Sequence, residues 1–449
     1  MRYLKVFVYL FALCACIAGC TPAGGLKCNI GVADITPDEP VVLAGFAARS
    51  GLSTTVHRPL KTRCLVVKDD STTVCIISND MMELPPKYAD GLRDEIAERT
   101  GIPRGNIFIH CTHTHSAPRV GGGSAEPGGT NHAFAQKVRR VVVDNAVLTI
   151  INDKAFKPFT IETGKAQSDI NCNRGEKDGP CDHDVYAARL LDKRGRPIVS
   201  LVNFACHPVS LNHRSLLVST DFPGITVDEL MKVWGGETFY FSGAAGNVNP
   251  CGPLQADTSY TQQRGLELAE AAKGITFEKT GGKGRLLVKN LTVNLPYRAD
   301  RITPEVINAH VDEIRQWDVS GTWKGDVDRW QQEILERIAA GEVKNYLPFE
   351  IAAVNMDGLV LLFSQGEPFS EYQTSVRASK PGHPILFIAY TNGQNSYLPD
   401  KHAYQSTAYE YEKEQMHIYI KAPYPLSNDM PIVYETALKK LSGDVLKNE

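Results

Sequence analysis

Short apolar runs alternate with amphipathic stretches along most of the chain. Residues 72–78 form a β-rich apolar run, residues 88–100 have the spacing of an amphipathic helix, and residues 106–111 are apolar again. Strand-length runs separated by helix-length stretches are typical of an α/β domain. The same pattern predicts strands at 160–163, 184–191, 197–206, 238–241, 285–295 and 349–363, and helices at 133–152 and 262–273.

Between residues 303 and 341 the pattern becomes continuously helical. Thr303 is a suitable N-cap and Pro304 suits the first helical position, so we expect a helical hairpin inserted in the domain. No repeat and no long linker divides the chain. The predicted fold class is therefore α/β, with mixed β-sheets, packed helices and a helical hairpin insertion in a single catalytic domain.

The composition excludes some partners. The 449 residues are 43% hydrophobic and 22% charged, which is ordinary for a globular protein with a sizeable core. Lys and Arg number 48 against 51 Asp and Glu, a net charge of −3 with no block of like charges. We therefore expect no nucleic-acid partner.

The N-terminus has the pattern of an export signal. Arg2 and Lys5 precede an apolar run at 6–18, which is too short to span a bilayer of about 30 Å. The run ends in Ile-Ala-Gly-Cys20, which resembles the lipobox of bacterial lipoproteins. The resemblance implies a signal peptide at 1–19, an acylated Cys20 that anchors an exported protein to the cell envelope, a tether at 20–29 and a domain at 30–449. An ordinary secretory signal that contains a Cys is the alternative, and the membrane face stays open.

The chain has 11 cysteines and no CxxC pair. Cys172 and Cys181 bracket a loop rich in Gly and Asp and are candidates for a disulfide, although spacing alone proves no connectivity. Oligomeric state stays open as well.

Three histidines follow apolar strands. Thr-His113-Thr-His115-Ser comes directly after residues 106–111, and two His at i and i+2 reach the same side of an extended chain. His207 follows the apolar run at 198–204. Carboxyl ends of strands are where α/β sheets assemble sites, so the three favour a metal centre. The alternatives are polar surface for the pair and a core histidine for His207.

Glu367 follows the apolar run at 358–363. A carboxylate beside a buried strand is costly unless it pairs or binds a cation, so Glu367 is either a metal ligand or an exposed turn residue. The sequence alone leaves both open.

Six segments in order resemble the neutral ceramidase family, from Gly31 to the region after Tyr409. They are Gly-Val-Ala-Asp-Ile-Thr-Pro at 31–37, Thr-His-Thr-His-Ser at 112–116, Asn-Phe-Ala-Cys-His-Pro at 203–208, Gly-Ala-Ala-Gly-Asn-Val-Asn-Pro at 243–250, the Gly-Glu turn at 366–367 and a Tyr-rich C-terminal segment. Such an ordered set is far more specific than any one motif.

The resemblance implies a Zn²⁺ ion and assigns roles to seven residues. The metal ligands would be His113, His207, Glu367 and Tyr397. His115 would be the acid/base partner, Tyr409 would donate a hydrogen bond to the substrate carbonyl, and Arg174 would hold or polarise it. For Tyr404 we expect a packing role.

The chain departs from the family at one loop. Asn249 stands where ceramidases carry a Ser, and Asn247 replaces an acidic residue. An amide cannot act as an acyl-enzyme nucleophile, so hydrolysis must use metal-activated water. Forty residues follow Tyr409, so we expect no C-terminal immunoglobulin-like domain, and ceramide itself becomes an open question.

The leading hypothesis is a zinc-dependent hydrolase that cleaves a linear, ceramide-like N-acyl bond. The second is an esterase or deacylase acting on a glycan or another acylated small molecule, which substrate profiling would separate from the first. The third is an inactive surface lipoprotein that binds lipid or glycan, motivated by Asn247 and Asn249. Retention of all four candidate metal ligands argues against it.

Overall fold

The computed structural model describes residues 25–318, 324–409, 413 and 424–447. The predicted signal peptide and the anchor at Cys20 lie outside the described residues. Strand β1 (Lys27–Asp34) already begins inside the predicted tether, so residues 27–29 are part of the folded domain. Among the described residues no helix combines the length and the apolar character needed to cross a membrane.

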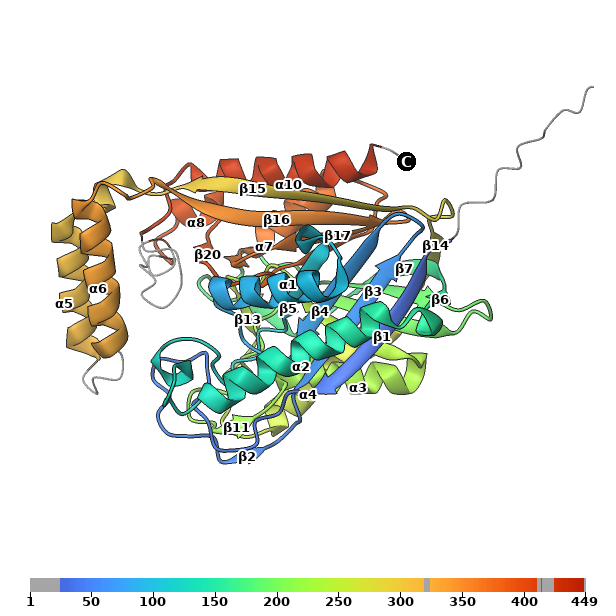
Figure 1. The fold of residues 1–449 in the computed structure, drawn as a ribbon, viewed down its shortest axis with the longest axis horizontal. Helices are drawn as coiled ribbons and strands as arrows, with labels where there is room; N and C mark the ends of the chain where they lie inside the picture. The colour runs from blue at the N-terminus through green and yellow to red at the C-terminus, as the bar shows by residue number, and fades with distance from the viewer. Residues whose placement is uncertain (1–24, 319–323, 410–412, 414–423, 448–449) are drawn as a thin grey trace, which may run out of the picture.

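Three sheets form the body of the domain (Figure 1). The first has the order β5-β4-β3-β1-β6, with β3 (Lys61–Lys68), β4 (Thr73–Asn79), β5 (Ile107–Cys111) and β6 (Lys157–Pro158). The second has the order β12-β10-β9-β7-β14, with β7 (Thr160–Gln167), β9 (Asp184–Leu191), β10 (Pro197–Phe204), β12 (Glu237–Ser242) and β14 (Glu278–Thr280). The third has the order β15-β16-β17-β19, with β15 (Leu286–Pro296), β16 (Tyr346–Met356), β17 (Leu359–Ser364) and β19 (Ile385–Ile388).

Strands that are apolar on both faces let the three sheets share one central core. In β3, Leu65 and Val67 face this core, whereas Cys64 and Val66 face the opposite way. Side chains from all three sheets meet in the central core, including Phe108, Phe241 and Phe363. Because side chains alternate along a strand, each sheet has a second apolar face that helices must cover.

Helices cover these outer faces. Helices α1 (Pro86–Thr100) and α2 (His132–Ile151) pack on the first sheet, and α3 (Asp221–Trp234) and α4 (Ser259–Lys273) pack on the second. Helices α7 (Ser370–Ala378) and α10 (Met430–Leu446) cover the third sheet, with α8 (Lys401–Gln405) nearby. The short strands β2 (Thr55–Val56), β8 (Asn171–Asn173), β11 (Leu217–Val218), β13 (Val248–Pro250), β18 (Glu367–Pro368) and β20 (Tyr397–Leu398) pair outside the three sheets.

The predicted fold class is confirmed. Helices α5 (Pro304–Trp317) and α6 (Lys324–Ala339) form the expected hairpin, which stands at one end of the molecule (Figure 1). Its start is capped by the Thr303 side chain, which accepts a hydrogen bond from Val306 N at 3.3 Å. The run expected at 349–363 is two strands, because Asp357 and Gly358 both have positive φ (52° and 95°) and form a turn.

His110 joins the three sheets at one point. It lies on β5, its Nδ1 donates to Ala389 O just after β19 (2.8 Å), and its Nε2 accepts from Ser242 N at the end of β12 (3.3 Å). The carboxyl ends of β5 and β10 therefore open into the same region, as the sequence predicted for the histidines that follow them.

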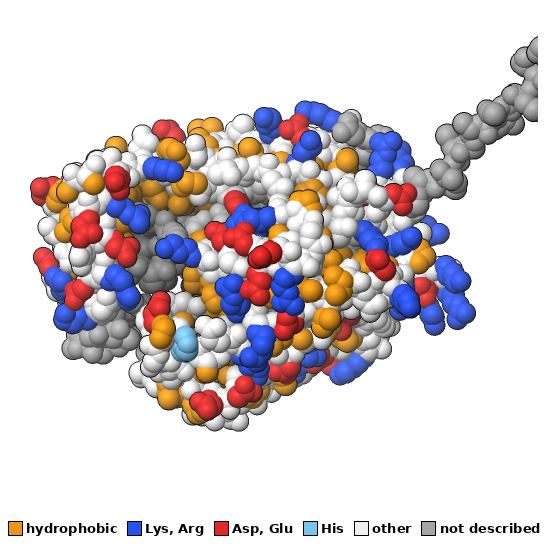
Figure 2. Space-filling model, in the orientation of Figure 1, with side chains coloured by type: hydrophobic (Ala, Val, Ile, Leu, Met, Phe, Trp, Pro, Cys, Tyr) orange, Lys and Arg blue, Asp and Glu red, His pale blue; other side chains and the backbone are white. Residues whose placement is uncertain are grey.

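Charges are mixed over the visible surface. On the face shown in Figure 2, Lys and Arg side chains lie among Asp and Glu side chains over most of the surface, and several Lys and Arg side chains gather at the right-hand edge.

Candidate metal and catalytic site

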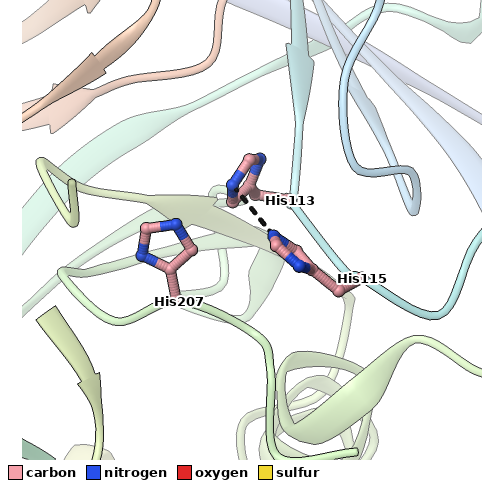
Figure 3. A group of neighbouring side chains, drawn as sticks. All are labelled: His113, His115 and His207. Carbon is pink, nitrogen blue, oxygen red and sulfur yellow. Dashed lines mark hydrogen bonds between the residues drawn. The ribbon is translucent and has the colours of Figure 1, made fainter. Parts of the chain in front are cut away.

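The segment after β5 turns tightly and directs two histidines inward. His113 has a left-handed backbone (φ 68°), and its N–H donates to Met81 O at 2.8 Å. A residue with a β-carbon adopts this conformation only where its surroundings hold it. Nε2 of His113 and Nε2 of His115 lie 3.3 Å apart (Figure 3), and both side chains are buried.

Residues 44–49 enclose His115. The Arg49 Nη1 donates to His115 O at 2.6 Å, and the Phe46 ring lies edge-on to the imidazole at 5.1 Å. Gly45 touches the ring, since a β-carbon there would lie 2.4 Å from its Cγ. Burial, with His113 adding to it, lowers the pKa of His115 well below its usual value. Its Nδ1 is buried and has no hydrogen-bond partner among the described residues.

His207 reaches the same centre from the end of β10. Its Nδ1 faces Ala245 O at 2.6 Å, and its Nε2 lies 3.0 Å from Glu367 Oε2. The ring centres of His113 and His207 are 4.8 Å apart. Residues 94 positions apart in the sequence are thus brought together by the meeting of two sheets.

Glu367 closes the centre from the segment that follows β17 of the third sheet. It lies on β18 after Gly366, pairs with Tyr397 on β20, and is 5% exposed. Its Oε2 lies 3.4 Å from His113 Nε2. Burial by itself would raise the pKa of the Glu367 carboxyl, but His113 and His207 beside it hold that pKa well below its usual range. The carboxylate is therefore charged.

These residues fit a metal ion. The Nδ1 atoms of His113 and His207 face the carbonyl oxygens of Met82 (2.8 Å) and Ala245 (2.6 Å), so each Nδ1 carries a proton, and each Nε2 would present a lone pair once a metal ion displaces any proton there. Ligand atoms of the three histidines lie within 4.8 Å of one another. Lone pairs and a carboxylate that point at one centre repel each other unless a cation lies between them.

Tyr397 and Arg174 lie at the edge of this centre. Tyr397 is half-buried, and the Arg174 guanidinium is 5.1 Å from the centre of its ring. Arg174 N donates to Asn247 O at 2.8 Å, which fixes the loop after β8 against the segment before β13. The structure therefore places Tyr397 beside Glu367 and Arg174 beside Tyr397.

Tyr409 packs between the loop after β8 and the start of α7. Its hydroxyl donates to Asn173 Oδ1 at 2.7 Å, its ring packs edge-on to Phe369 at 5.2 Å, and a β-carbon at Gly175 would lie 2.4 Å from its Cε1. The hydroxyl is thus already paired in this structure. Tyr404 donates to Leu426 O at 3.1 Å and packs against the core, which confirms its packing role.

Asn247 and Asn249, in the loop where the chain departs from the family, have different surroundings. Asn247 is buried, and its Oδ1 accepts from Ser370 N, the first residue of α7, at 2.9 Å. This contact makes Asn247 a structural residue. Asn249 pairs with Cys172 across β8 and β13, and its Oδ1 is buried with no partner among the described residues.

The disulfide candidate is wrong in this structure. Cys172 and Cys181 are both free thiols. Antiparallel pairing of β8 with β13 puts Cys251, rather than Cys181, diagonally across from Cys172.

Sequence reasoning missed three residues of the site. Gln394 Nε2 donates to Glu367 Oε1, and the Tyr390 ring stacks on His113 with 4.0 Å between ring centres. Burial, with Glu367 adding to it, raises the pKa of the Glu83 carboxyl to about 7. Glu83 follows β4 as His113 follows β5. Its position after a buried strand could therefore have predicted that Glu83 lies near the site. Nothing local marks Tyr390 or Gln394.

Fold and site together define an α/β protein with a candidate histidine–carboxylate metal centre where three sheets meet. Residues 27–233 match the family model described as neutral/alkaline non-lysosomal ceramidase, N-terminal. The resemblance found in the sequence is thereby confirmed.

Individual relatives agree. Neutral ceramidases A and B of Dictyostelium discoideum are each 26% identical to this chain, over 218 and 219 residues. Each match covers 43% of this chain and 30% of the relative. The crystal structure of neutral ceramidase from Pseudomonas aeruginosa superposes with a TM-score of 0.69 at 16% identity, covering 94% of this chain and 75% of that one. A ceramidase complexed with C2 gives a TM-score of 0.70 at 16% identity, covering 94% and 76%. At this identity the structures show a shared fold.

Proposed function

We propose that the chain is a zinc-dependent amidohydrolase that uses water to cleave a ceramide-like N-acyl bond. The observation that carries the proposal is a buried centre in which Glu367 Oε2 lies 3.4 Å from His113 Nε2 and 3.0 Å from His207 Nε2. Two imidazoles and a carboxylate are a donor set that suits zinc, and Tyr397 beside Glu367 is the proposed fourth ligand. Names of the related proteins support the substrate class.

Each residue around the centre has a separate proposed role in the reaction. A zinc ion here would supply a water of pKa about 7 and polarise the acyl oxygen. His115, with its low pKa, is neutral at pH 7 and can accept the proton of the attacking water and later deliver it to the leaving amine. The Arg174 guanidinium provides positive charge beside Tyr397, where it stabilises negative charge on the acyl oxygen.

Asn249 favours direct attack of water on the substrate. Its amide lies at the position where ceramidases carry a Ser, and an amide forms no acyl-enzyme. Water would therefore add directly to the acyl carbon, and the C–N bond would then break to release the protonated amine, with no covalent bond between enzyme and acyl group.

The proposal includes an exported, lipid-anchored protein. The charged, apolar and Cys20-containing segment at the N-terminus supports this part. Metabolic labelling with a fatty acid tests it: label is expected in the native chain and absent from Cys20→Ala. Label retained by Cys20→Ala would contradict an anchor at that residue.

The test of function measures amine release from a short-chain fluorescent ceramide by the chain without residues 1–20. Turnover is expected, with loss on addition of a zinc chelator and recovery with zinc. Glu367→Gln should lower turnover by more than the roughly 10–100-fold that outer partners of metal ligands contribute. The matched control is Glu98→Gln, an exposed carboxylate on α1, which should leave turnover unchanged.

Each other outcome has a defined meaning. Full activity without metal contradicts the zinc mechanism. Bound zinc with no cleavage of ceramide, but cleavage of smaller esters in a broad panel, supports the esterase or deacylase instead. Bound zinc with no turnover of any acyl substrate supports the inactive binding protein.

A further inference from the structure

Tyr390 joins the two loops that carry the candidate metal ligands. It follows β19, its N–H donates to Gly366 O at 3.2 Å, and its carbonyl accepts from Cys111 N at 3.2 Å. Gly366 precedes Glu367, and Cys111 lies two residues before His113. Tyr390 has a left-handed backbone (φ 53°), which is uncommon for a bulky residue and clusters at functional sites.

Its ring packs on the imidazoles of the centre. The planes of Tyr390 and His113 are inclined by only 20° with 4.0 Å between ring centres, and His207 lies edge-on at 6.3 Å. The residue is 3% exposed. Its ring is therefore part of the wall of the centre.

The Tyr390 hydroxyl is buried, and among the described residues it has no hydrogen-bond partner. Buried phenols almost always have one, because an unpaired buried O–H is costly. Burial, with Glu367, Tyr397 and Tyr240 adding to it and Arg174 opposing it, raises the pKa of this hydroxyl well above its usual value. A partner for it is thus to be sought inside the centre.

We propose that Tyr390 is a further residue of the metal centre, whose hydroxyl donates a hydrogen bond to the water that the loaded centre holds. The inference rests on the proposed function, because that function requires a metal ion with a bound water. It explains why a phenol without a partner is kept beside His113 and Glu367. It also gives the centre a phenolic donor that is not already paired, unlike Tyr409, whose hydroxyl is bonded to Asn173.

The test compares the stability of Tyr390→Phe with and without zinc. In the metal-free protein the substitution removes an unpaired hydroxyl, so the thermal midpoint is expected to equal or exceed that of the native chain. In the loaded protein the substitution removes a hydrogen bond, so zinc should stabilise Tyr390→Phe less than it stabilises the native chain. Competition with a chromogenic chelator should show zinc affinity lowered by about 10–100-fold.

Tyr434→Phe is the matched control. Tyr434 is also a fully buried phenol, but its hydroxyl lies 2.5 Å from Ser364 Oγ. Its loss should lower the midpoint equally with and without zinc and should leave zinc affinity unchanged.

The outcomes separate the two proposals. A native chain that binds no zinc overturns the proposed function and the role of Tyr390 together. A native chain that binds zinc, with Tyr390→Phe matching it in affinity and in zinc-dependent stabilisation, overturns the role of Tyr390 alone. A lower midpoint of Tyr390→Phe by the same amount in both states overturns it too, because that result indicates simple packing.

Discussion

Glu367 Oε2 lies 3.0 Å from His207 Nε2, although the two residues are 160 positions apart in the sequence. The contact is made because β10 and β18 belong to different sheets whose ends meet at one point. Glu367 Oε1, in turn, accepts a hydrogen bond from Gln394 Nε2. One carboxylate oxygen therefore faces the metal centre while the other is fixed by an amide.

Gln394→Ala tests that second contact. Outer partners orient metal ligands, so removal of this amide should lower metal affinity by about 10–100-fold without abolishing binding. Zinc competition with a chromogenic chelator measures it. The matched control is Gln332→Ala, because Gln332 Nε2 also donates to a glutamate, Glu336, but on the exposed face of α6. Equal zinc affinity for both variants would show that the Gln394 contact does not orient Glu367.

Gly45→Ala should disturb His115. Gly45 has a φ of 100°, and a β-carbon there would lie 2.4 Å from His115 Cγ, so the ring must move from His113. The backbone conformation costs roughly 1–2 kcal/mol, and the crowding adds a further cost of about 1–3 kcal/mol. Both zinc affinity and unfolding in urea should show the change.

Gly51→Ala separates the two costs. Gly51 has a similar φ of 91°, but the nearest atom to an added β-carbon is Leu216 Cδ1 at 3.6 Å. This variant should be destabilised only by the cost of the backbone conformation, roughly 1–2 kcal/mol. Its zinc affinity should equal that of the native chain. Equal losses of zinc affinity in both variants would contradict a specific role for the Gly45 contact.

Much of the site could be predicted from local sequence, because several of its residues directly follow buried strands. His113, His115 and His207 each follow an apolar strand, and the carboxyl ends of β5 and β10 do meet. Glu367 follows β17 in the same way. The family resemblance added Tyr397, which the structure pairs with Glu367, and Arg174, which lies beside the Tyr397 ring.

The other site residues could not be predicted from local sequence, because they reach the site only through contacts between segments that are distant in the sequence. Gln394 and Tyr390 lie in the connection between β19 and β20, and only its closure over β5 and β18 brings them to the site. The candidate pairing of Cys172 with Cys181 failed for the same reason, since the register of β8 with β13 puts Cys251 diagonally across from Cys172. Strand β1 was missed because its burial is irregular, with Cys28 alone fully buried.

Asn247→Ala should destabilise the fold through α7. The substitution leaves the buried Ser370 N–H without its acceptor, which costs about 1–3 kcal/mol. Asn247→Asp keeps an acceptor at the N-terminus of a helix, where negative charge is favourable, and should lose less. The acidic residue of the family can therefore serve the same contact. Urea unfolding of the two variants checks the order, and a more stable Asn247→Ala would contradict it.

His110 should make the fold sensitive to acid. Burial lowers its pKa from 6.5 to about 3; the hydrogen bond to Ala389 O opposes this shift, and His113 adds to it. The unfolded chain therefore binds more protons than the native one between these pH values, and stability falls as pH drops from 6.5 towards 3. Between pH 7 and pH 5 the loss from this group is about 2 kcal/mol.

Urea unfolding at pH 7, 6 and 5, with a chelator present so that no metal competes with protons, measures that loss. His110→Gln should be less stable than the native chain at pH 7, because both bonds between the sheets are altered. Its further loss on going to pH 5 should be smaller than that of the native chain by about 2 kcal/mol. Parallel pH dependence in the two proteins would show that His110 is protonated equally in the native and unfolded states, and the junction of the three sheets would then not be the source of acid sensitivity.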